Sequence, residues 1–114
     1  MRSGINEFES LKVKKCKTDT KMNKYTNDKI EAELKTLNGW KYHKDALEKD
    51  FVFKSFKDAM ANMVRIGFEA EKLNHHPEWF NVYNKLNIRL RTHDADGITT
   101  KDFTLAKKID ELTA

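Results

Sequence analysis

Hydrophobic residues recur along this chain with two periods, one typical of helices and one typical of strands. The stretches in which apolar positions lie three or four residues apart, and which therefore predict helices, are 27–37, 55–73 and 99–112. Two of these helices begin with capping-box patterns, Ser55 with Asp58 and Thr99 with Asp102. The pair Asn38-Gly39 supplies a stop signal after the first helix. The pattern therefore predicts three helices with defined ends.

Short stretches between the helices show the alternation of strands, and they fall into two pairs. These stretches are 40–42, 47–53, 79–83 and 86–92. In the last of them, Leu86, Ile88 and Leu90 alternate with polar residues. Links of hairpin length, 43–45 and 84–85, join the strands of each pair. The order α-β-β-α-β-β-α predicts an α+β fold, a four-stranded antiparallel sheet with three helices packed on one face.

The helix predicted at 55–73 carries many of the apolar residues expected to contact the sheet. They share one helical face and are Phe56, Ala59, Met60, Met63, Gly67 and Ala70. Phe68 lies about 120° from the centre of that face on a helical wheel. We therefore expect Phe68 to be exposed, which makes it a candidate subunit contact.

Charge divides the chain into two parts at about residue 24. Residues 11–24 hold six lysines against one aspartate, whereas residues 25–114 hold 15 basic and 15 acidic residues. The net charge of +4 thus belongs to a lysine-rich extension, residues 1–24, which has few apolar residues and is predicted to be disordered. Residues 25–114 are predicted to form a single domain. Its core is thin enough that assembly into a homodimer or homotetramer would stabilise it.

Neither a membrane span nor an export signal is recognisable in the sequence. No apolar run approaches the length needed to cross a bilayer, and the N-terminus lacks the apolar core and cleavage site of a signal peptide. We therefore expect a cytoplasmic protein without membrane partners, and a nuclear location also stays open. The single cysteine, Cys16, excludes an intramolecular disulfide and any zinc site built on several thiolates.

The stretch LNHHPEWFNVYN, residues 73–84, holds the clearest indication of chemistry. His75 and His76 precede the only proline, Pro77, at the predicted junction between a helix and a strand. His93 follows the last strand. Because a hairpin returns the ends of its two strands to the same edge of the sheet, we expect the three imidazoles to be neighbours.

The residues expected around these histidines favour acid/base chemistry. Trp79 and Tyr83 would place aromatic rings beside the imidazoles, and Asp102 is expected at the same edge of the sheet in addition to its capping role. A metal site is disfavoured, because adjacent histidines point in different directions and neither an HExxH motif nor a set of thiolates is present. No serine or cysteine near the cluster forms a nucleophile elbow. Metal-free proton transfer fits best, since imidazole titrates near neutral pH.

The run Glu71-Lys-Leu-Asn-His75-His76-Pro77, followed by Tyr83, His93 and Asp102 at their intervals, closely resembles the signature of the pterin-4a-carbinolamine dehydratases. The similarity extends from about Gly39 to the C-terminus and does not include the lysine-rich region. It implies helices on one face of a four-stranded antiparallel sheet, in a dimer or tetramer. The implied activity is that of a lyase, which dehydrates 4a-hydroxytetrahydropterin, such as 4a-hydroxytetrahydrobiopterin, to quinonoid dihydropterin in tetrahydrobiopterin recycling.

The resemblance also implies roles for individual residues. His75 and His93 would carry out the two proton transfers, and His76 would bind and orient the pterin; which histidine is the acid stays open. The residues implied to bind substrate or to support the histidines are Glu71, Pro77, Trp79, Thr92 and Asp102. No metal and no other cofactor is implied.

Two other functions stay open. Some animal relatives of this family also act as dimerisation cofactors of a homeodomain transcription factor, so a protein-binding or coactivator role, alone or beside catalysis, is the alternative. Such a role needs an exposed apolar helix face, of which Phe68 is the only sign in the sequence. Nucleic-acid binding through the lysine-rich extension is disfavoured, because residues 25–114 are neutral.

Overall fold

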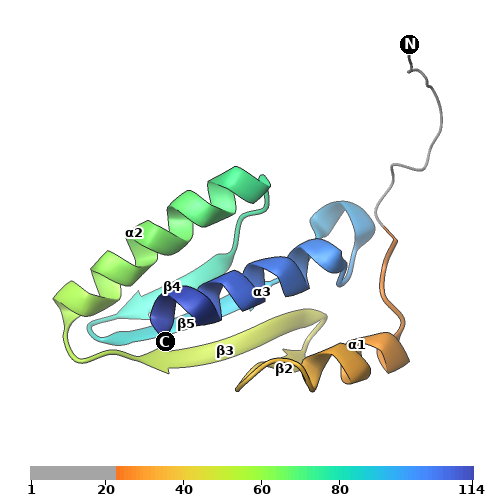
Figure 1. Cartoon of the computed structure of the whole chain (residues 1–114), viewed down its shortest axis with the longest axis horizontal. Helices are drawn as coiled ribbons and strands as arrows, with labels where there is room; N and C mark the ends of the chain where they lie inside the picture. The colour runs from red at the N-terminus through yellow and green to blue at the C-terminus, as the bar shows by residue number, and fades with distance from the viewer. Residues whose placement is uncertain (1–22) are drawn as a thin grey trace, which may run out of the picture.

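Four strands form one antiparallel sheet in the order β2-β3-β5-β4 (Figure 1). The strands are β2, Lys41–His43; β3, Ala46–Val52; β4, Glu78–Val82; and β5, Lys85–Leu90. The computed structural model describes residues 23–114. Most of the lysine-rich extension, residues 1–22, lies outside the described residues, and so does the disorder predicted for it. Each hairpin pairs consecutive strands, and β5 joins the two hairpins by pairing with β3. This leaves β2 and β4 at the edges of the sheet.

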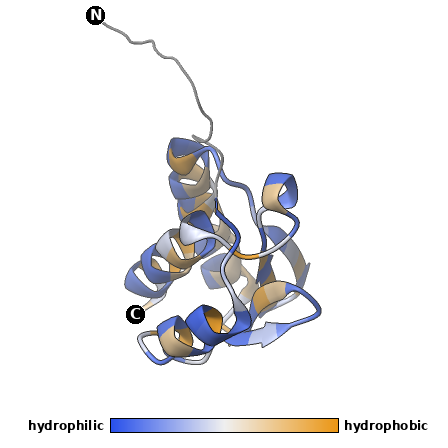
Figure 2. Cartoon of the chain, turned by 90° about the vertical axis from the view of Figure 1, so that its right-hand side faces the viewer, coloured by the Kyte–Doolittle hydropathy of each residue, from blue (hydrophilic) through white to orange (hydrophobic). Residues whose placement is uncertain are grey.

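Three helices complete the predicted order of elements. They are α1, Asn27–Leu34; α2, Phe56–Leu73; and α3, Thr100–Thr113, and a 3₁₀ turn, η1, spans His93–Ala95. α2 and α3 lie side by side against the same face of the sheet (Figure 1). Coloured by hydropathy, the helices carry both hydrophobic and hydrophilic residues, as amphipathic helices do (Figure 2). The predicted α+β class and element order are confirmed.

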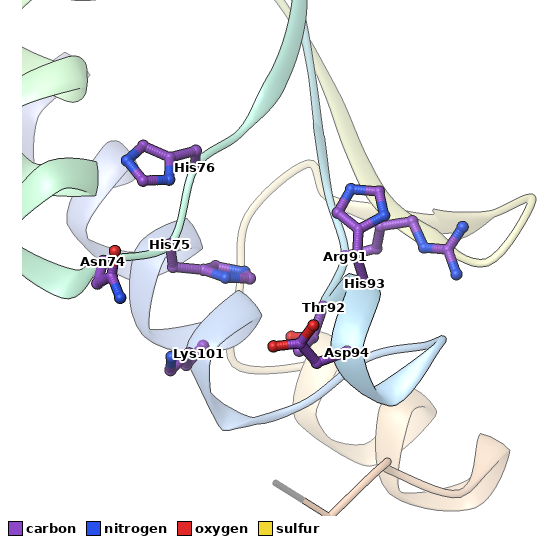
Figure 3. Close-up of a pocket in the computed structure, with 8 residues that line it drawn as sticks. All are labelled: Asn74, His75, His76, Arg91, Thr92, His93, Asp94 and Lys101. Carbon is purple, nitrogen blue, oxygen red and sulfur yellow. The ribbon is translucent and has the colours of Figure 1, made fainter.

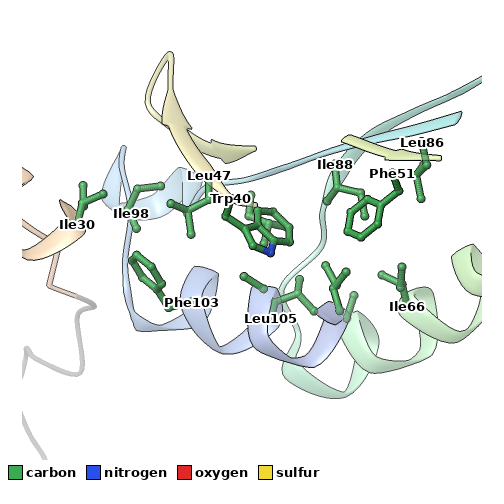
Figure 4. Packing of buried hydrophobic residues seen from close by; sticks show 14 residues of the cluster. Ile30, Trp40, Leu47, Phe51, Ile66, Leu86, Ile88, Ile98, Phe103 and Leu105 are labelled. Atoms are coloured by element: carbon green, nitrogen blue, oxygen red, sulfur yellow. The ribbon is translucent and has the colours of Figure 1, made fainter. Parts of the chain in front are cut away.

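The core lies between this face of the sheet and the two long helices (Figure 4). Every second residue of β5 is buried, and these residues are Leu86, Ile88 and Leu90. Ile66 of α2 and Leu105 of α3 are fully buried in the same cluster. The alternation predicted for the last strand is therefore confirmed, and it fixes which face of the sheet the helices cover.

The first helix ends earlier than predicted. The spacing of apolar residues predicts a helix through Leu37, whereas α1 ends at Leu34. The chain then tightens into bonds between residues three apart, and the Leu37 amide donates to the Leu34 carbonyl at 3.0 Å. Gly39 has φ +87, a left-handed conformation that glycine adopts without steric cost. The predicted stop signal therefore ends the turn that follows the helix.

The second hairpin turns one residue earlier than predicted. Tyr83 and Asn84 form its link, because Val82 pairs with Lys85. The reason is a reciprocal pair of hydrogen bonds, in which the Phe53 amide donates to the Asn84 carbonyl and the Asn84 side chain donates to the Phe53 carbonyl, each at 2.8 Å. Tyr83 therefore lies at the closed end of the hairpin, and the expectation that its ring lies beside the histidines is wrong.

The face of α2 that contacts the core differs in part from the predicted one. Ala59 and Ala70 are buried as predicted, together with Ile66, which the prediction omitted. Phe56 and Met60 were expected in the core, but they are 45% and 42% exposed. The buried stripe is rotated away from them because α2 packs on α3 and β5 through the side that carries Ile66.

The other face of the sheet carries a network of charged and polar side chains. Glu48 of β3 accepts hydrogen bonds from His43 Nδ1 at 2.8 Å and from Asn87 Nδ2 at 2.7 Å. Arg89 Nη1 donates to the same carboxylate at 3.4 Å. The bonds from His43 and then from Asn87 hold the pKa of Glu48 below its ordinary value.

We predict that Glu48 contributes to stability only where it is ionised. Because its folded-state pKa is lowered, the contribution is fully present above the unfolded-state pKa, about 4.3 for a glutamate, and is lost as the pH falls through the folded-state pKa. Glu48→Gln should therefore lower the free energy of unfolding at neutral pH and have progressively less effect in acid. Urea denaturation followed by circular dichroism over this pH range measures the difference. The control is Glu111→Gln on α3, and curves for Glu48→Gln and parent that stay parallel at all pH values would refute the prediction.

Candidate active site

The end of α2 determines where His75 lies. Asn74 follows the last helical residue in the left-handed conformation, with φ 51. The amides of Asn74 and His75 donate to the carbonyls of Glu71 and Ala70 at 3.1 and 3.0 Å. Asparagine tolerates this conformation, and the bonds satisfy carbonyls that the helix end leaves free. The chain turns sharply here, and His75 is only 8% exposed.

Asp102 is the buried partner of His75. Its Oδ1 lies 2.6 Å from His75 Nε2, and the Asp102 side chain has no exposed surface. Its Oδ2 accepts hydrogen bonds from the Thr99 amide at 2.9 Å and from the Thr92 hydroxyl at 2.8 Å. An ionised carboxylate only accepts, so His75 Nε2 donates and Nδ1 is the nitrogen left free in the neutral ring. Asp102 thus caps α3, as its capping box predicts, and also holds His75.

A tight loop brings Thr92 to the start of α3. The Thr92 amide donates to the Gly97 carbonyl at 2.8 Å, and the Gly97 amide donates back to the Thr92 carbonyl at 3.3 Å. Asp96, which precedes the glycine, has φ 54. The loop places the hydroxyls of Thr92 and Thr99 2.7 Å apart, in the buried network around Asp102. The predicted DADG turn therefore joins the last strand to the cap of the last helix.

The other two histidines also contact carboxylates, at more exposed positions. His76 Nε2 lies 2.9 Å from Glu71 Oε1, with side chains 60% and 77% exposed. His93 Nε2 lies 3.3 Å from Glu78 Oε2, with side chains 67% and 48% exposed. Exposed ion pairs contribute little to folding stability. Each of the three imidazoles thus has one ring nitrogen beside a carboxylate, and only the His75 pair is part of the protein interior.

The three histidines line one cavity of about 220 Å³. Figure 3 shows His75 and His76 on the segment that follows α2 and His93 on the segment that follows β5. Pockets for drug-sized molecules typically measure about 300–1,000 Å³, so this cavity suits a smaller ligand. The convergence expected from the hairpin geometry is therefore present in the structure.

The other predicted site residues lie at different distances from the cavity. Thr92 lines it. Glu71 and Asp102 reach it only through the imidazoles that they contact. Pro77 precedes β4 and Trp79 pairs with Ile88 in the sheet, and neither residue is part of the cavity lining.

Four residues that line the cavity were not predicted: Asn74, Arg91, Asp94 and Lys101. Each stands one residue from a predicted site residue in the sequence, and that adjacency is the only signal that could have identified them. The Arg91 side chain extends away from His75 (Figure 3) and pairs with Asp96 at 2.5 Å. Glu78, the partner of His93, was also missed, because a carboxylate at the start of an edge strand is common on protein surfaces.

Two further findings describe the chemistry open to the site. Within residues 23–114, no three or more histidine, cysteine, aspartate or glutamate side chains are grouped so that they could hold a metal ion. No helix in the same part of the chain is long and apolar enough to cross a membrane. The side chains that line the cavity can donate or accept protons through imidazole nitrogens and hydrogen-bond through Asn74, Thr92 and Lys101.

Fold and cavity together define a small α+β protein with a histidine-lined site suited to proton transfer. The chain belongs to the pterin 4 alpha carbinolamine dehydratase family, whose model matches residues 23–112. The match covers all of the described helices and strands up to the last turn of α3. The family suggested by the histidine signature is therefore confirmed.

Two relatives are matched to this chain over more than nine tenths of their own length, and a solved structure over all of its chain. A protein of Christiangramia forsetii with the provisional name pterin-4-alpha-carbinolamine dehydratase is 50% identical over 91 residues, which cover 80% of this chain and 94% of the relative. One of Opitutus terrae, with the same provisional name, is 51% identical over 89 residues, 77% of this chain and 92% of the relative. The crystal structure of a Brucella melitensis protein described as transcriptional coactivator/pterin dehydratase superposes with a TM-score of 0.79 at 36% identity, covering 81% of this chain and all of that one.

We predict that Thr92→Val destabilises the fold by about 1–3 kcal/mol, because it leaves a buried carboxylate and a buried hydroxyl each short of one hydrogen bond. Valine has nearly the same shape as threonine, so packing is preserved. The free energy of unfolding in urea measures the loss. Thr104→Val, at an exposed position of α3, is the matched control. Equal stability of the two variants would show that the Thr92 hydroxyl does not hold Asp102.

Proposed function

We propose that this chain dehydrates 4a-hydroxytetrahydropterin, such as 4a-hydroxytetrahydrobiopterin, to quinonoid dihydropterin by histidine acid/base catalysis. The observation that carries the proposal is the convergence of three imidazoles on one small cavity, each with a carboxylate on Nε2. Membership of the pterin carbinolamine dehydratase family supports the pterin substrate. The product is the oxidised pterin that a reductase returns to tetrahydropterin, so the reaction belongs to the recycling of that cofactor.

The chemistry requires two proton transfers at neighbouring atoms. One proton goes to the hydroxyl that departs from C4a as water, and one is removed from N5, whose electrons then form the C=N bond. The overall reaction is a loss of water without oxidation or reduction, so it requires neither a metal nor another cofactor. Imidazole suits both transfers because it is partly protonated near neutral pH.

The positions of the three rings support the proposed roles. His75 is fixed by Asp102, and His93 approaches the cavity from the other side, so the two can act on different atoms of one ring bound between them. His76, oriented by Glu71, binds the pterin. Thr92 acts through Asp102, and Pro77 directs the chain from His76 into β4. An aromatic wall from Trp79 is not part of the proposal, because that side chain does not line the cavity.

The test is the ultraviolet absorbance time course of freshly generated 4a-hydroxytetrahydropterin with parent and variant proteins. His75→Ala and His93→Ala should each slow dehydration by about 10²–10⁴-fold, the usual contribution of a general acid or base. His43→Ala is the matched control, since that imidazole lies on β2 outside the cavity. Circular dichroism confirms that each variant is folded. A folded parent that gives no acceleration over buffer would refute the dehydratase assignment.

The outer side of α2 carries exposed apolar side chains, which favour a second candidate function, the binding of another protein chain. Four apolar side chains at every fourth residue are 42–68% exposed, and they are Phe56, Met60, Val64 and Phe68. This spacing places them along one side of the helix, as in helices that bind other helices. We propose that this apolar stripe binds a second copy of the chain and forms a homo-oligomer. The description of the Brucella protein as transcriptional coactivator/pterin dehydratase supports a foreign protein as the alternative occupant.

We predict that Val64→Glu with Phe68→Glu dissociates the oligomer, because it places two carboxylates in an apolar contact. Light scattering should give a multiple of 13.4 kDa for the parent and the single-chain mass for the double variant, while dehydration persists. Thr104→Glu, which adds a carboxylate to an exposed position of α3, is the control. An unchanged mass in the double variant would exclude this stripe as the contact. A monomeric parent would exclude self-association and favour the foreign partner.

A further inference from the structure

Glu78, the first residue of β4, shares its carboxylate between His93 and an arginine of the neighbouring strand. Oε2 lies 3.3 Å from His93 Nε2, and Oε1 lies 3.7 Å from Arg89 Nε. None of the roles proposed above uses Glu78. Because His93 is one of the two histidines proposed to transfer protons, a group that controls the position of its ring bears directly on the reaction.

Strand register explains why these three side chains meet. Glu78 and Arg89 are Cα partners in the antiparallel pair of β4 and β5, so their side chains project from the same face of the sheet. This is the face opposite the helices, because the alternate positions of β5 form the core. His93 follows the end of β5 by three residues. The hairpin therefore brings the start of one strand and the segment after the other to one contact.

Arg89 is itself held in place, which fixes the position of Glu78. Its Nη2 donates to the Lys44 carbonyl at 3.0 Å, and its Nη1 donates to Glu48 Oε1 at 3.4 Å. The Arg89 side chain is 24% exposed, whereas that of Glu78 is 48% exposed. Glu48 can pair with Arg89 as a carboxylate at neutral pH, since the bonds from His43 and Asn87 hold its pKa below the ordinary value. Charge thus alternates along the sheet face from Glu48 through Arg89 to Glu78, and the Glu78 carboxylate contacts His93.

The contact with His93 resembles the better buried one at His75. In both pairs the carboxylate lies beside Nε2, which leaves Nδ1 as the second ring nitrogen. At 3.3 Å the His93–Glu78 contact is an ion pair outside the usual range of hydrogen-bond distances, and contacts in catalytic sites that are long without substrate often tighten when substrate binds. Because both side chains are half exposed or more, the contact contributes little to folding stability. Its effect is therefore expected in the orientation of the ring.

We propose that Glu78 is a positioning residue, held by Arg89, that keeps the His93 imidazole in one rotamer with Nε2 toward the carboxylate and Nδ1 available for proton transfer. The catalytic part of this inference rests on the proposed dehydratase function. The structural part is that His93 has a single rotamer that depends on Glu78. This part does not rest on the proposed function.

The structural part is tested by NMR on the free protein. Three-bond couplings of the Cγ atom report the side-chain rotamer of each histidine. The parent should show one rotamer for His93, and Glu78→Ala should show averaged couplings for His93 while those of His75 stay unchanged. Asp50→Ala, which removes a carboxylate from the same sheet face, is the matched control and should leave the parent couplings of His93 intact. Averaged couplings in the parent, or unchanged couplings in Glu78→Ala, would overturn the proposal.

The catalytic part is tested in the dehydration assay. Glu78→Ala should lower kcat about tenfold, with a smaller change in KM. This loss is smaller than that expected on removal of a general acid or base itself, because Glu78 acts only through His93. The loss should vanish in a His93→Ala background and persist in a His75→Ala background. A loss that persists without His93 would show that Glu78 acts elsewhere. An inactive parent would refute the proposed function, and the couplings alone would then decide whether Glu78 positions His93.

Discussion

The buried carboxylate of Asp102 is the interaction on which the candidate site depends. It has no exposed surface and accepts hydrogen bonds from the cap of α3 and from Thr92 after β5, and it contacts the imidazole of His75 after α2. A buried charge is costly unless its hydrogen bonds are complete. The three chain segments must therefore close around this carboxylate together. A single aspartate therefore serves both the cap of α3 and the placement of His75.

The histidines differ in how firmly the fold holds them, and the difference fits the chemistry. His75 lies in the interior and its geometry is set by folding, whereas His76 and His93 stand in solvent with exposed carboxylate partners. A substrate that enters the cavity meets one imidazole fixed in the interior and two at exposed positions, of which His93 is the one that we propose Glu78 holds in place. Two rings held in position would suit the proposed proton transfers at two neighbouring atoms, because a general acid or base must lie within hydrogen-bond reach of the proton that it moves.

Patterns along the sequence predicted the order of helices and strands well. They missed the features that depend on contacts between residues far apart in the sequence. Capping residues and the alternation of β5 depend on neighbours in sequence, so Thr99 and Ile88 were placed correctly. The turn at Tyr83 was displaced because the bonds that fix it come from Phe53, on another strand. The buried stripe of α2 was misjudged for the same reason, since the position of α3 decides which apolar side chains of α2 are covered. In the site, the histidines were found by residue type, whereas Glu78 could be found only through strand register.

That register links the open face of the sheet to the cavity. A shift of one residue between β4 and β5 would move Glu78 to the helix side and separate it from both Arg89 and His93. The core fixes the side of β5 from which Arg89 projects, because turning this strand over would expose Leu86, Ile88 and Leu90. The hydrophobic core therefore fixes the face of the sheet on which Arg89 can meet Glu78. Only this register allows the charged network on the outer face to reach the site.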